Sequence, residues 1–196
     1  STGLASKLLR AIVSASGGVM IIALLLTMIC CIVLGMGVPT TATYCIMAAT
    51  CAPILMSPEI GVEMLAAHFF VFYFGIVADI TPPVALAAYA GAAIAKAGPM
   101  KTAFNASRLA IAAFIVPYII AMNPAMLFIN TTIPEVVMIT ITSIIGIFGV
   151  AAGLSGFVFR NMKWWERILC IVGGLTLLVP GSLTDLIGLV LVGAVC

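Results

Sequence analysis

Two short segments rich in glycine, proline and threonine interrupt apolar stretches of this sequence, and their groups suit reversible binding of ions and acids. An interrupted helix leaves backbone N–H and C=O groups without helical partners. N–H groups at a helix start attract carboxylates, whereas free carbonyls and threonine hydroxyls suit sodium. At membrane depth such groups are tolerated only where protein, water or a ligand satisfies them. The candidate binding residues are Gly35, Gly37, Pro39, Thr40, Thr41 and Thr43 at the first break (residues 35–43), and Asp79, Thr81, Pro82 and Pro83 at the second break (residues 79–84).

Asp79 is the one acidic residue between Glu63 and Glu135. An intramembrane carboxylate is a candidate cation ligand, proton carrier or partner of a base. The alternative is that Asp79 only caps a free N–H group where the helix is broken. The sequence leaves both interpretations open.

The composition indicates an integral membrane protein. The 196 residues are 64% hydrophobic and 7% charged, the mean hydropathy is +1.35, and no charged residue occurs between positions 11 and 58. A span needs roughly twenty apolar residues, and the apolar segments do not alternate with period two, so the prediction is an all-α, polytopic fold in a lipid bilayer. A net charge of +2 with scattered bases does not indicate a nucleic-acid surface.

Glycine, proline and charge positions divide the chain into five predicted segments. Residues 19–56 form either a re-entrant hairpin around the first break or two spans of which the second is kinked. Residues 64–95 form one apolar helix that is broken at Pro82 and Pro83, the alternative being a simple proline kink. The predicted segments are a connecting or interfacial helix (1–18), the hairpin (19–56), the broken helix (64–95), a cytoplasmic amphipathic connector (96–108), and carboxy-terminal transmembrane helices (109–196).

Basic residues orient these segments by the positive-inside tendency. The bases between Lys96 and Arg108 predict a cytoplasmic connector, residues 109–128 then return outward, and residues 136–159 come back to a second basic group. Lys7 and Arg10 fit this orientation less well. Residues 168–180 and 186–196 form either one tilted span or a terminal hairpin.

Other residue patterns have structural explanations. Four glycines share one helix face and predict close packing with a neighbour, and Trp164 and Trp165 beside basic residues are typical of interfacial anchors. The six cysteines lack C-x-x-C spacing and are interpreted as small hydrophobic residues. The glycines are Gly146, Gly149, Gly153 and Gly156.

No residues are grouped as a nucleophile, a base and an orienting group. His68 and Asp79 are the one conceivable acid–base pair, and their spacing of eleven residues is about three turns of a straight helix, too far for contact. The sequence therefore predicts neither an enzyme nor a cofactor.

Three motifs carry a resemblance to a known family. They are LGMGVPTTATY at residues 34–44, AHFFVFYF at 67–74 and TPPVALAAY at 81–89, with NPAML at 123–127 and WWER at 164–167 in support. Together they resemble the carboxy-terminal half of the large membrane (permease) subunit of TRAP transporters, and they are most similar to the fused permeases of the TAXI branch.

The resemblance implies a sodium-coupled elevator transporter in the inner (cytoplasmic) membrane that imports organic acids delivered by an extracytoplasmic substrate-binding protein. Sodium would be the coupling ion. Further partners would be the amino-terminal half of the permease and a small membrane subunit or its fused equivalent. Residues 19–95 would be half of a transport domain, and residues 109–196 would be scaffold and carboxy-terminal transmembrane helices. The first break would be a hairpin tip and the second an unwound helix segment, both from one of two inverted repeats. With the other repeat missing, we expect the chain to be part of a longer protein.

Asp79 departs from the small, uncharged residue expected at that position in the family. Two other functions also fit the pattern. A re-entrant loop with a threonine-rich tip is compatible with an ion channel, and the chain could instead be a structural membrane subunit.

Overall fold

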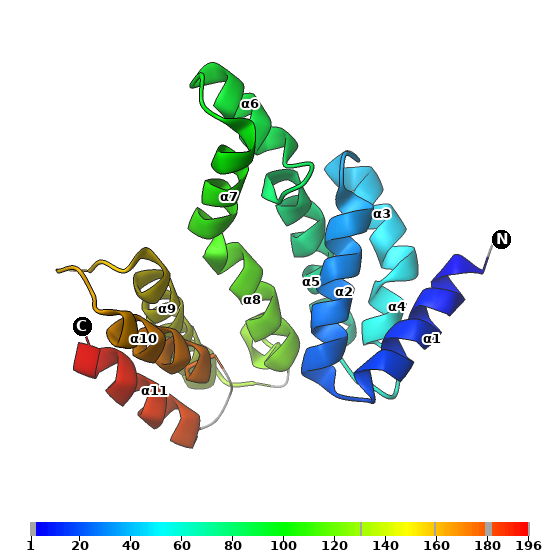
Figure 1. Ribbon diagram of the computed structural model, residues 1–196. Helices are drawn as coiled ribbons and strands as arrows, with labels where there is room; N and C mark the ends of the chain where they lie inside the picture. Colours follow the sequence, from blue (N-terminus) through cyan, green and yellow to red (C-terminus); the bar gives the residue numbers. More distant parts are fainter. Residues whose placement is uncertain (1–2, 130, 159, 179–181, 196) are drawn as a thin grey trace. The chain divides into compact units, whose positions relative to one another are not determined.

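The computed structural model describes residues 3–129, 131–158, 160–178 and 182–195. Within these residues the secondary structure is helical, apart from one isolated bridge between Phe157 and Asn161. The chain divides into two compact units, Ser1–Ala121 and Met122–Cys196, which are described separately. The elements are α1 (Leu4–Ser16), α2 (Met20–Gly35), α3 (Thr40–Thr50), α4 (Ala52–Leu55), α5 (Met64–Val77), η1 (Ala78–Ile80), α6 (Leu86–Ile94), α7 (Pro99–Leu109), α8 (Ile111–Met122), η2 (Pro124–Leu127), α9 (Ile133–Ser155), α10 (Trp164–Thr176) and α11 (Ser182–Val195) (Figure 1).

Helix α1 forms where a connecting helix was predicted. It ends at Ser16, and the following Gly17 and Gly18 both adopt positive φ, which glycine allows without steric cost. Lys7 and Arg10 are exposed, whereas Ile12 is buried. The helix is therefore amphipathic, and its position at a membrane interface stays a prediction.

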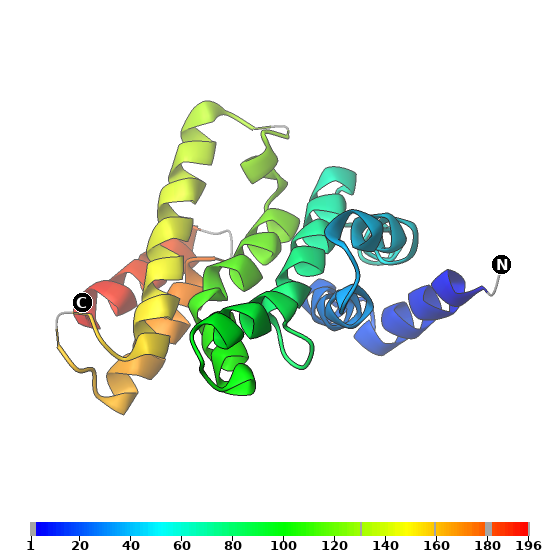
Figure 2. The ribbon, with the colours of Figure 1, turned by 90° about the horizontal axis from the view of Figure 1, so that it is seen from above.

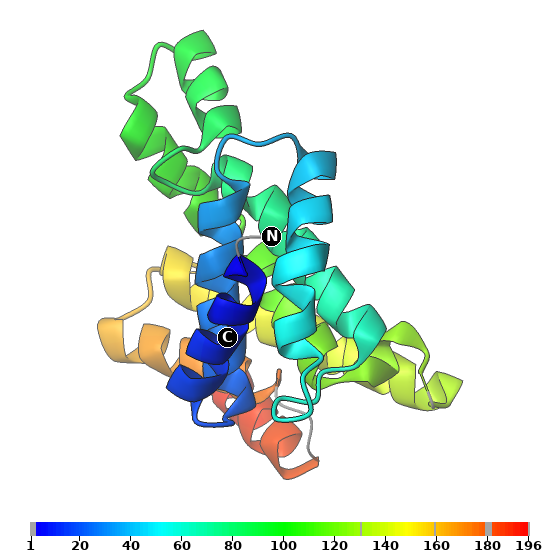
Figure 3. The same ribbon diagram turned by 90° about the vertical axis from the view of Figure 1, so that its right-hand side faces the viewer.

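Helix α2 and the helices α3 and α4 run in opposite directions and form a helical hairpin, with residues 36–39 crossing between them (Figure 3). Gly37 has a φ of 74°, which favours glycine, and Pro39 precedes the first residue of α3, where its missing N–H costs nothing. The first break predicted from the sequence is confirmed. Whether the hairpin is re-entrant stays a prediction.

Helix α5 lies at the centre of the first unit. It contacts α2, α3 and α4. Phe70 and Phe74 are fully buried, and their ring centroids lie 5.3 Å and 5.9 Å from that of Tyr118 in α8. Residues 109–121 thus pack with the first unit. The sequence grouped them with residues 122–196 as scaffold, and that functional division stays a prediction.

The apolar run of residues 64–95 is interrupted where the two prolines predict it. Helix α5 ends at Val77, the 3₁₀ turn η1 follows, and the helix resumes at Leu86 after Ala85, whose φ is 37°. Because several residues separate α5 from α6, the segment is a break rather than a simple kink.

The predicted outward helix at residues 109–128 differs in its limits. Helix α8 ends at Met122, and α7 precedes it with a bend of 42° between the two helices (Figure 2). Together α7 and α8 are long and apolar enough to cross a membrane. The sequence placed α7 on the surface because its bases and hydroxyls gave it an amphipathic character.

Among the described helices, α9 is the only one that is long and apolar enough to cross a membrane by itself. Four apolar segments are shorter: Met20–Gly35, Thr40–Leu55, Met64–Ile80 and Thr184–Gly193. Several helices also expose large apolar side chains, as expected of surfaces that meet lipid. Examples on α2 and α9 are Ile21, Ile22, Leu25, Ile29, Val33, Val137, Met138, Ile141, Ile144 and Phe148.

In the second unit α10 packs against both α9 and α11. A Cβ atom on Gly173 would lie 2.7 Å from Leu191 Cβ, so α10 and α11 lie side by side and are not one tilted span. Of the two alternatives for the end of the chain, the structure has the helical hairpin.

The turn before α10 is held by an ion pair. Arg160 Nη2 lies 2.8 Å from Glu166 Oε1, and the Lys163 backbone N–H donates to Glu166 Oε2 at 2.9 Å. The bond from Arg160, and then that from Lys163, holds the pKa of the Glu166 carboxyl below its ordinary value. Glu166 therefore stays ionised at neutral pH and fixes the start of the helix.

The glycine face of α9 packs against α10 as predicted. A Cβ on Gly146 would lie 2.9 Å from the Gly174 carbonyl oxygen, and one on Gly149 would lie 3.2 Å from the Cys170 carbonyl oxygen. Gly156 instead ends the helix, with a φ of 74°. These glycines allow close approach of the two backbones.

Gly153→Ala is expected to destabilise the second unit. The added Cβ would lie 2.6 Å from Ile171 Cγ1 and 2.7 Å from the Arg167 carbonyl oxygen, so the helices must separate, at a cost of about 1–3 kcal/mol. Thermal unfolding of the purified protein in detergent measures this loss. Gly193→Ala is the control, because no atom lies within 4 Å of its new Cβ. A melting temperature unchanged in Gly153→Ala would contradict the packing.

Candidate functional site

The structure brings the two breaks together within the first unit. A Cβ placed on Gly35 would lie 3.0 Å from Ala78 Cβ, 3.2 Å from Met47 Cε and 3.3 Å from the Gly75 carbonyl oxygen. The end of α2 therefore lies directly against the end of α5 and η1. Because a larger side chain would separate these elements, Gly35 is required by close packing.

Thr43 is the most deeply buried of the candidate residues, with 1% of its surface exposed. Its hydroxyl donates to the Val38 carbonyl oxygen at 3.1 Å, and its methyl group would lie 3.2 Å from a Cβ on Gly75. Thr43 thus holds the chain that crosses between α2 and α3, and also contacts α5. Its hydroxyl proton is already used within the hairpin.

Thr40 and Thr41 are exposed in the first turn of α3. The first helical hydrogen bond of α3 runs from the Thr43 N–H to the carbonyl oxygen of Pro39, the residue just before the helix. The N–H groups that precede Thr43 therefore begin the helix without an i−4 carbonyl, and no side chain caps it. This end carries the partial positive charge that suits a carboxylate.

Hydroxyl groups satisfy several carbonyls of the second break. Thr81 Oγ1 donates to the Val77 carbonyl oxygen at 2.7 Å, and Ser107 Oγ lies 3.0 Å from the Ile80 carbonyl oxygen. The Tyr89 hydroxyl donates to the Pro83 carbonyl oxygen. The break is therefore a stabilised feature of the fold rather than a frayed helix end. A carbonyl oxygen has two lone pairs, so each retains capacity to bind a cation.

Sequence reasoning missed Ser107 and Tyr89 as members of this site. Ser107 lies in α7 and was interpreted as a polar residue of a surface helix, and Tyr89 lies in α6. Neither position carries a local signal, because each acts on a carbonyl in another element.

A groove of about 690 Å³ adjoins the second break. Its walls are mostly apolar, with two hydroxyl groups, and suit the carbon skeleton of a small ligand. The residues that line it are Thr81, Pro82, Pro83, Met100, Phe104, Ser107 and Phe114.

Asp79 lies in η1 and is partly exposed. Within the described chain its carboxylate accepts no hydrogen bond and forms no ion pair. The alternative of a local helix cap is therefore not what the structure shows. A partly exposed carboxylate beside the second break retains its capacity to bind a cation.

His68 contacts the hairpin rather than Asp79. Its Nδ1 shares a hydrogen bond of 3.1 Å with the Tyr44 hydroxyl, and the two rings meet edge to face. Leu65, Phe69 and Phe72 complete this small apolar pocket. His68 thus joins α5 to α3. Among the described residues no group of three His, Cys, Asp or Glu side chains is placed to hold a metal ion.

Comparison with known proteins places two families along the chain. Residues 1–136 match the model of the DctM component of the tripartite ATP-independent periplasmic (TRAP) transporter, and residues 136–188 match a domain of unknown function, DUF3394. No curated protein and no solved structure matches the chain. Both breaks lie inside the first match, which covers more than half of the 196 residues.

Proposed function

The chain belongs to the DctM family of tripartite ATP-independent periplasmic transporter components, and from this membership we propose that it forms part of a permease that imports organic acids on a sodium gradient. It is a membrane permease component, and the family is one of transporters rather than enzymes. The proposal adds the ion, the class of substrate and the residues that bind them.

The observation that carries the proposal is the contact between the two breaks. Gly35 lies against Gly75 and Ala78, so the hairpin and the interrupted helix end in one place. Paired helix interruptions are a recurrent way to build an ion and substrate site within a membrane. A single kink in a packing helix would not require this glycine contact.

We place the substrate carboxylate at the start of α3, near Thr40 and Thr41. The N–H groups there are uncapped and favour an anion. The carbon skeleton would lie along the groove at Pro82 and Pro83. This arrangement binds the acid at one end by charge and at the other by apolar contact.

Sodium would bind at the second break, on the Thr81 hydroxyl oxygen, the Asp79 carboxylate and neighbouring carbonyls. These are oxygen ligands, which suit a hard monovalent cation. Thr81 already donates its proton to Val77, so its oxygen lone pairs are oriented away from that bond. Gly35, Gly37, Pro39 and Pro83 would shape the site rather than contact the ion.

Binding of both ligands would lower the cost of moving the hairpin-bearing part of the protein across the membrane, as in an elevator. The proposed partners are an extracytoplasmic substrate-binding protein, the amino-terminal half of the permease and a small membrane subunit or its fused equivalent. The TAXI branch and multi-pass insertion in the inner membrane belong to the same proposal.

Asp79→Asn is expected to weaken sodium dependence. The amide keeps the size of the side chain but removes the charge, so the sodium concentration for half-maximal uptake should rise by about tenfold, the equivalent of about 1.4 kcal/mol. Glu59→Gln is the matched control, since Glu59 is exposed and lies in the turn before α5. Unchanged sodium activation in Asp79→Asn would remove this carboxylate from the site.

The function itself is tested by uptake of labelled organic acids into proteoliposomes that contain the full-length transporter. Sodium, potassium and proton gradients are compared, with and without the substrate-binding protein. Saturable uptake that requires both the sodium gradient and the binding protein is the expected result. Uptake driven equally by any gradient, or an electrical conductance without saturable exchange, would contradict it and indicate another coupling ion or a channel.

A further inference from the structure

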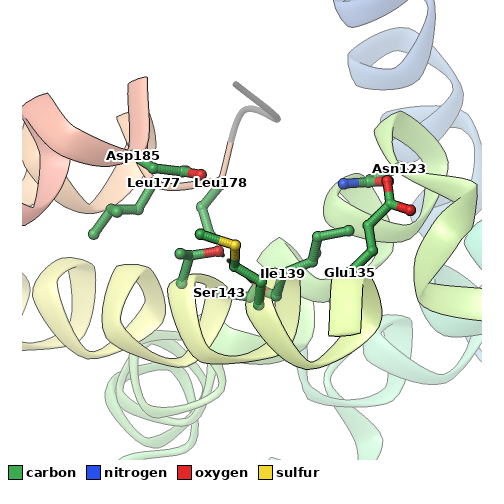
Figure 4. A pocket seen from close by; sticks show the side chains of 9 residues that line it. Asn123, Glu135, Ile139, Ser143, Leu177, Leu178 and Asp185 are labelled. Carbon is green, nitrogen blue, oxygen red and sulfur yellow. Dashed lines mark hydrogen bonds between the residues drawn. The ribbon is translucent and has the colours of Figure 1, made fainter. Parts of the chain in front are cut away.

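A second cavity lies in the other unit, which contains neither break. It has a volume of about 230 Å³, and Figure 4 shows Asp185 at one side of it and Glu135 with Asn123 at the other. Residues from the two matched families meet here, since Glu135 precedes the DUF3394 match and Asp185 lies within it. The lining residues are Asn123, Glu135, Met138, Ile139, Thr142, Ser143, Leu177, Leu178 and Asp185.

Ser143 gives this cavity a polar group without a partner. Its side chain is 5% exposed, it lines the cavity, and in the described part of the chain its hydroxyl makes no hydrogen bond. Its oxygen is not among the buried side-chain atoms that lack a partner in the described chain, so it is open to the cavity. The neighbouring Thr142 does not share this state, since its hydroxyl donates to the Ile139 carbonyl oxygen at 3.1 Å. Ser143 therefore offers the cavity a hydroxyl group that no other described residue uses.

The charged residues of the cavity indicate the charge of a ligand that would bind there. Glu135 and Asp185 are both carboxylates, and no Lys, Arg or His is among the lining residues. The Thr131 hydroxyl donates to one oxygen of Glu135 at 2.8 Å, which leaves further acceptor positions on this carboxylate. An anion would be repelled, whereas a cation with N–H donors would be attracted.

We propose that this cavity binds a small organic cation with a primary ammonium group. The three donors of an ammonium group suit the Glu135 carboxylate, the Asn123 amide oxygen and the Ser143 hydroxyl oxygen, and the Asp185 carboxylate at the other side of the cavity adds negative charge. The apolar walls, formed by Met138, Leu177 and neighbours, suit a short carbon chain. A bare metal ion fits less well, because three acidic, His or Cys ligands are not grouped among the described residues.

Binding is tested on the purified full-length transporter by thermal unfolding with n-butylamine, tetramethylammonium and sodium chloride at equal ionic strength. Tetramethylammonium has the same charge as butylammonium but no N–H donor. A saturable rise in melting temperature with butylamine alone is the expected result. Equal stabilisation by tetramethylammonium or sodium, or none by any of the three, would overturn the proposal.

Substitutions of the lining residues test whether butylamine binds in this cavity. Glu135→Gln and Asp185→Asn are each expected to weaken butylamine binding by about tenfold, because each removes a negative charge from the cavity. Ser143→Ala should weaken it while leaving the unliganded protein as stable or more stable. Glu59→Gln has the same chemical change as Glu135→Gln but lies in the first unit, so binding should be unchanged. Wild-type affinity in all three cavity variants would place the amine elsewhere.

A primary ammonium group can come from a free amine or from the phosphatidylethanolamine headgroup. Nanodiscs of phosphatidylcholine with and without phosphatidylethanolamine separate these sources. Competition between the lipid and butylamine assigns the site to the headgroup, and equal butylamine affinity in both nanodiscs assigns it to a soluble amine. Because the measurement is binding rather than uptake, it stands apart from the function proposed for the two breaks.

Discussion

Gly35→Val is expected to reduce sodium-driven uptake by at least about tenfold at normal protein levels. Even a single added carbon would lie 3.0 Å from Ala78 Cβ, which is fixed to the backbone, and the larger side chain must push α2 away from α5. Overpacking of this kind costs about 1–3 kcal/mol. The two breaks would then no longer form one site. Uptake of labelled substrate into proteoliposomes measures the loss.

Gly91→Ala is the matched control, because it also adds a side chain to a helical glycine of the first unit. No atom lies within 4 Å of its new Cβ. Transport should therefore be retained, and the helix should gain a little stability. Normal uptake by Gly35→Val would show that contact between the breaks is not needed for transport.

Thr81→Val is expected to raise the sodium concentration for half-maximal uptake by about tenfold. Valine keeps the branched shape of threonine but removes the hydroxyl that donates to the Val77 carbonyl oxygen at 2.7 Å. The variant thus loses a proposed sodium ligand and also leaves a carbonyl of the broken helix without its donor. Sodium titration of the initial uptake rate is the measurement.

Thr102→Val is the control for Thr81→Val, because it removes a similar helical hydroxyl outside the proposed site. The Thr102 hydroxyl donates to the Gly98 carbonyl oxygen at 3.1 Å, four residues earlier, just as Thr81 donates to Val77. Unlike Thr81, Thr102 does not line the groove. Its sodium dependence should stay that of the wild type. Equal sodium dependence in Thr81→Val and the wild type would exclude the hydroxyl from ion binding.

The elements with strong local signals were predictable from sequence. Two successive prolines cannot continue a helix, so the break at Pro82 and Pro83 follows from the chain alone. The tip of the hairpin follows in the same way from Gly37 and Pro39. The long apolar segment that became α9 was also predicted, with limits that differ by a few residues.

Contacts between distant residues were not predictable. Nothing near Ser107 indicates that its hydroxyl lies 3.0 Å from the Ile80 carbonyl oxygen, and nothing near Thr43 indicates that it is buried against Gly75. The sequence divided the connector from the next helix between residues 108 and 109, close to the bend between α7 and α8, but it gave no angle between them, and the surface position of α7 stays a prediction. That Ser143, Glu135 and Asp185 line one cavity likewise depends on how α9, α10 and α11 pack.

The central claim, that the two breaks act as one sodium-dependent site, is tested most directly by comparing wild type with Thr41→Ala and Thr81→Ala in the full-length transporter. Uptake is measured in proteoliposomes with the substrate-binding protein and an imposed sodium gradient. We predict that both variants, each altered in a different break, lose most of the sodium-dependent uptake at normal protein levels. Uptake that is indifferent to sodium, or unchanged in both variants, would contradict the account.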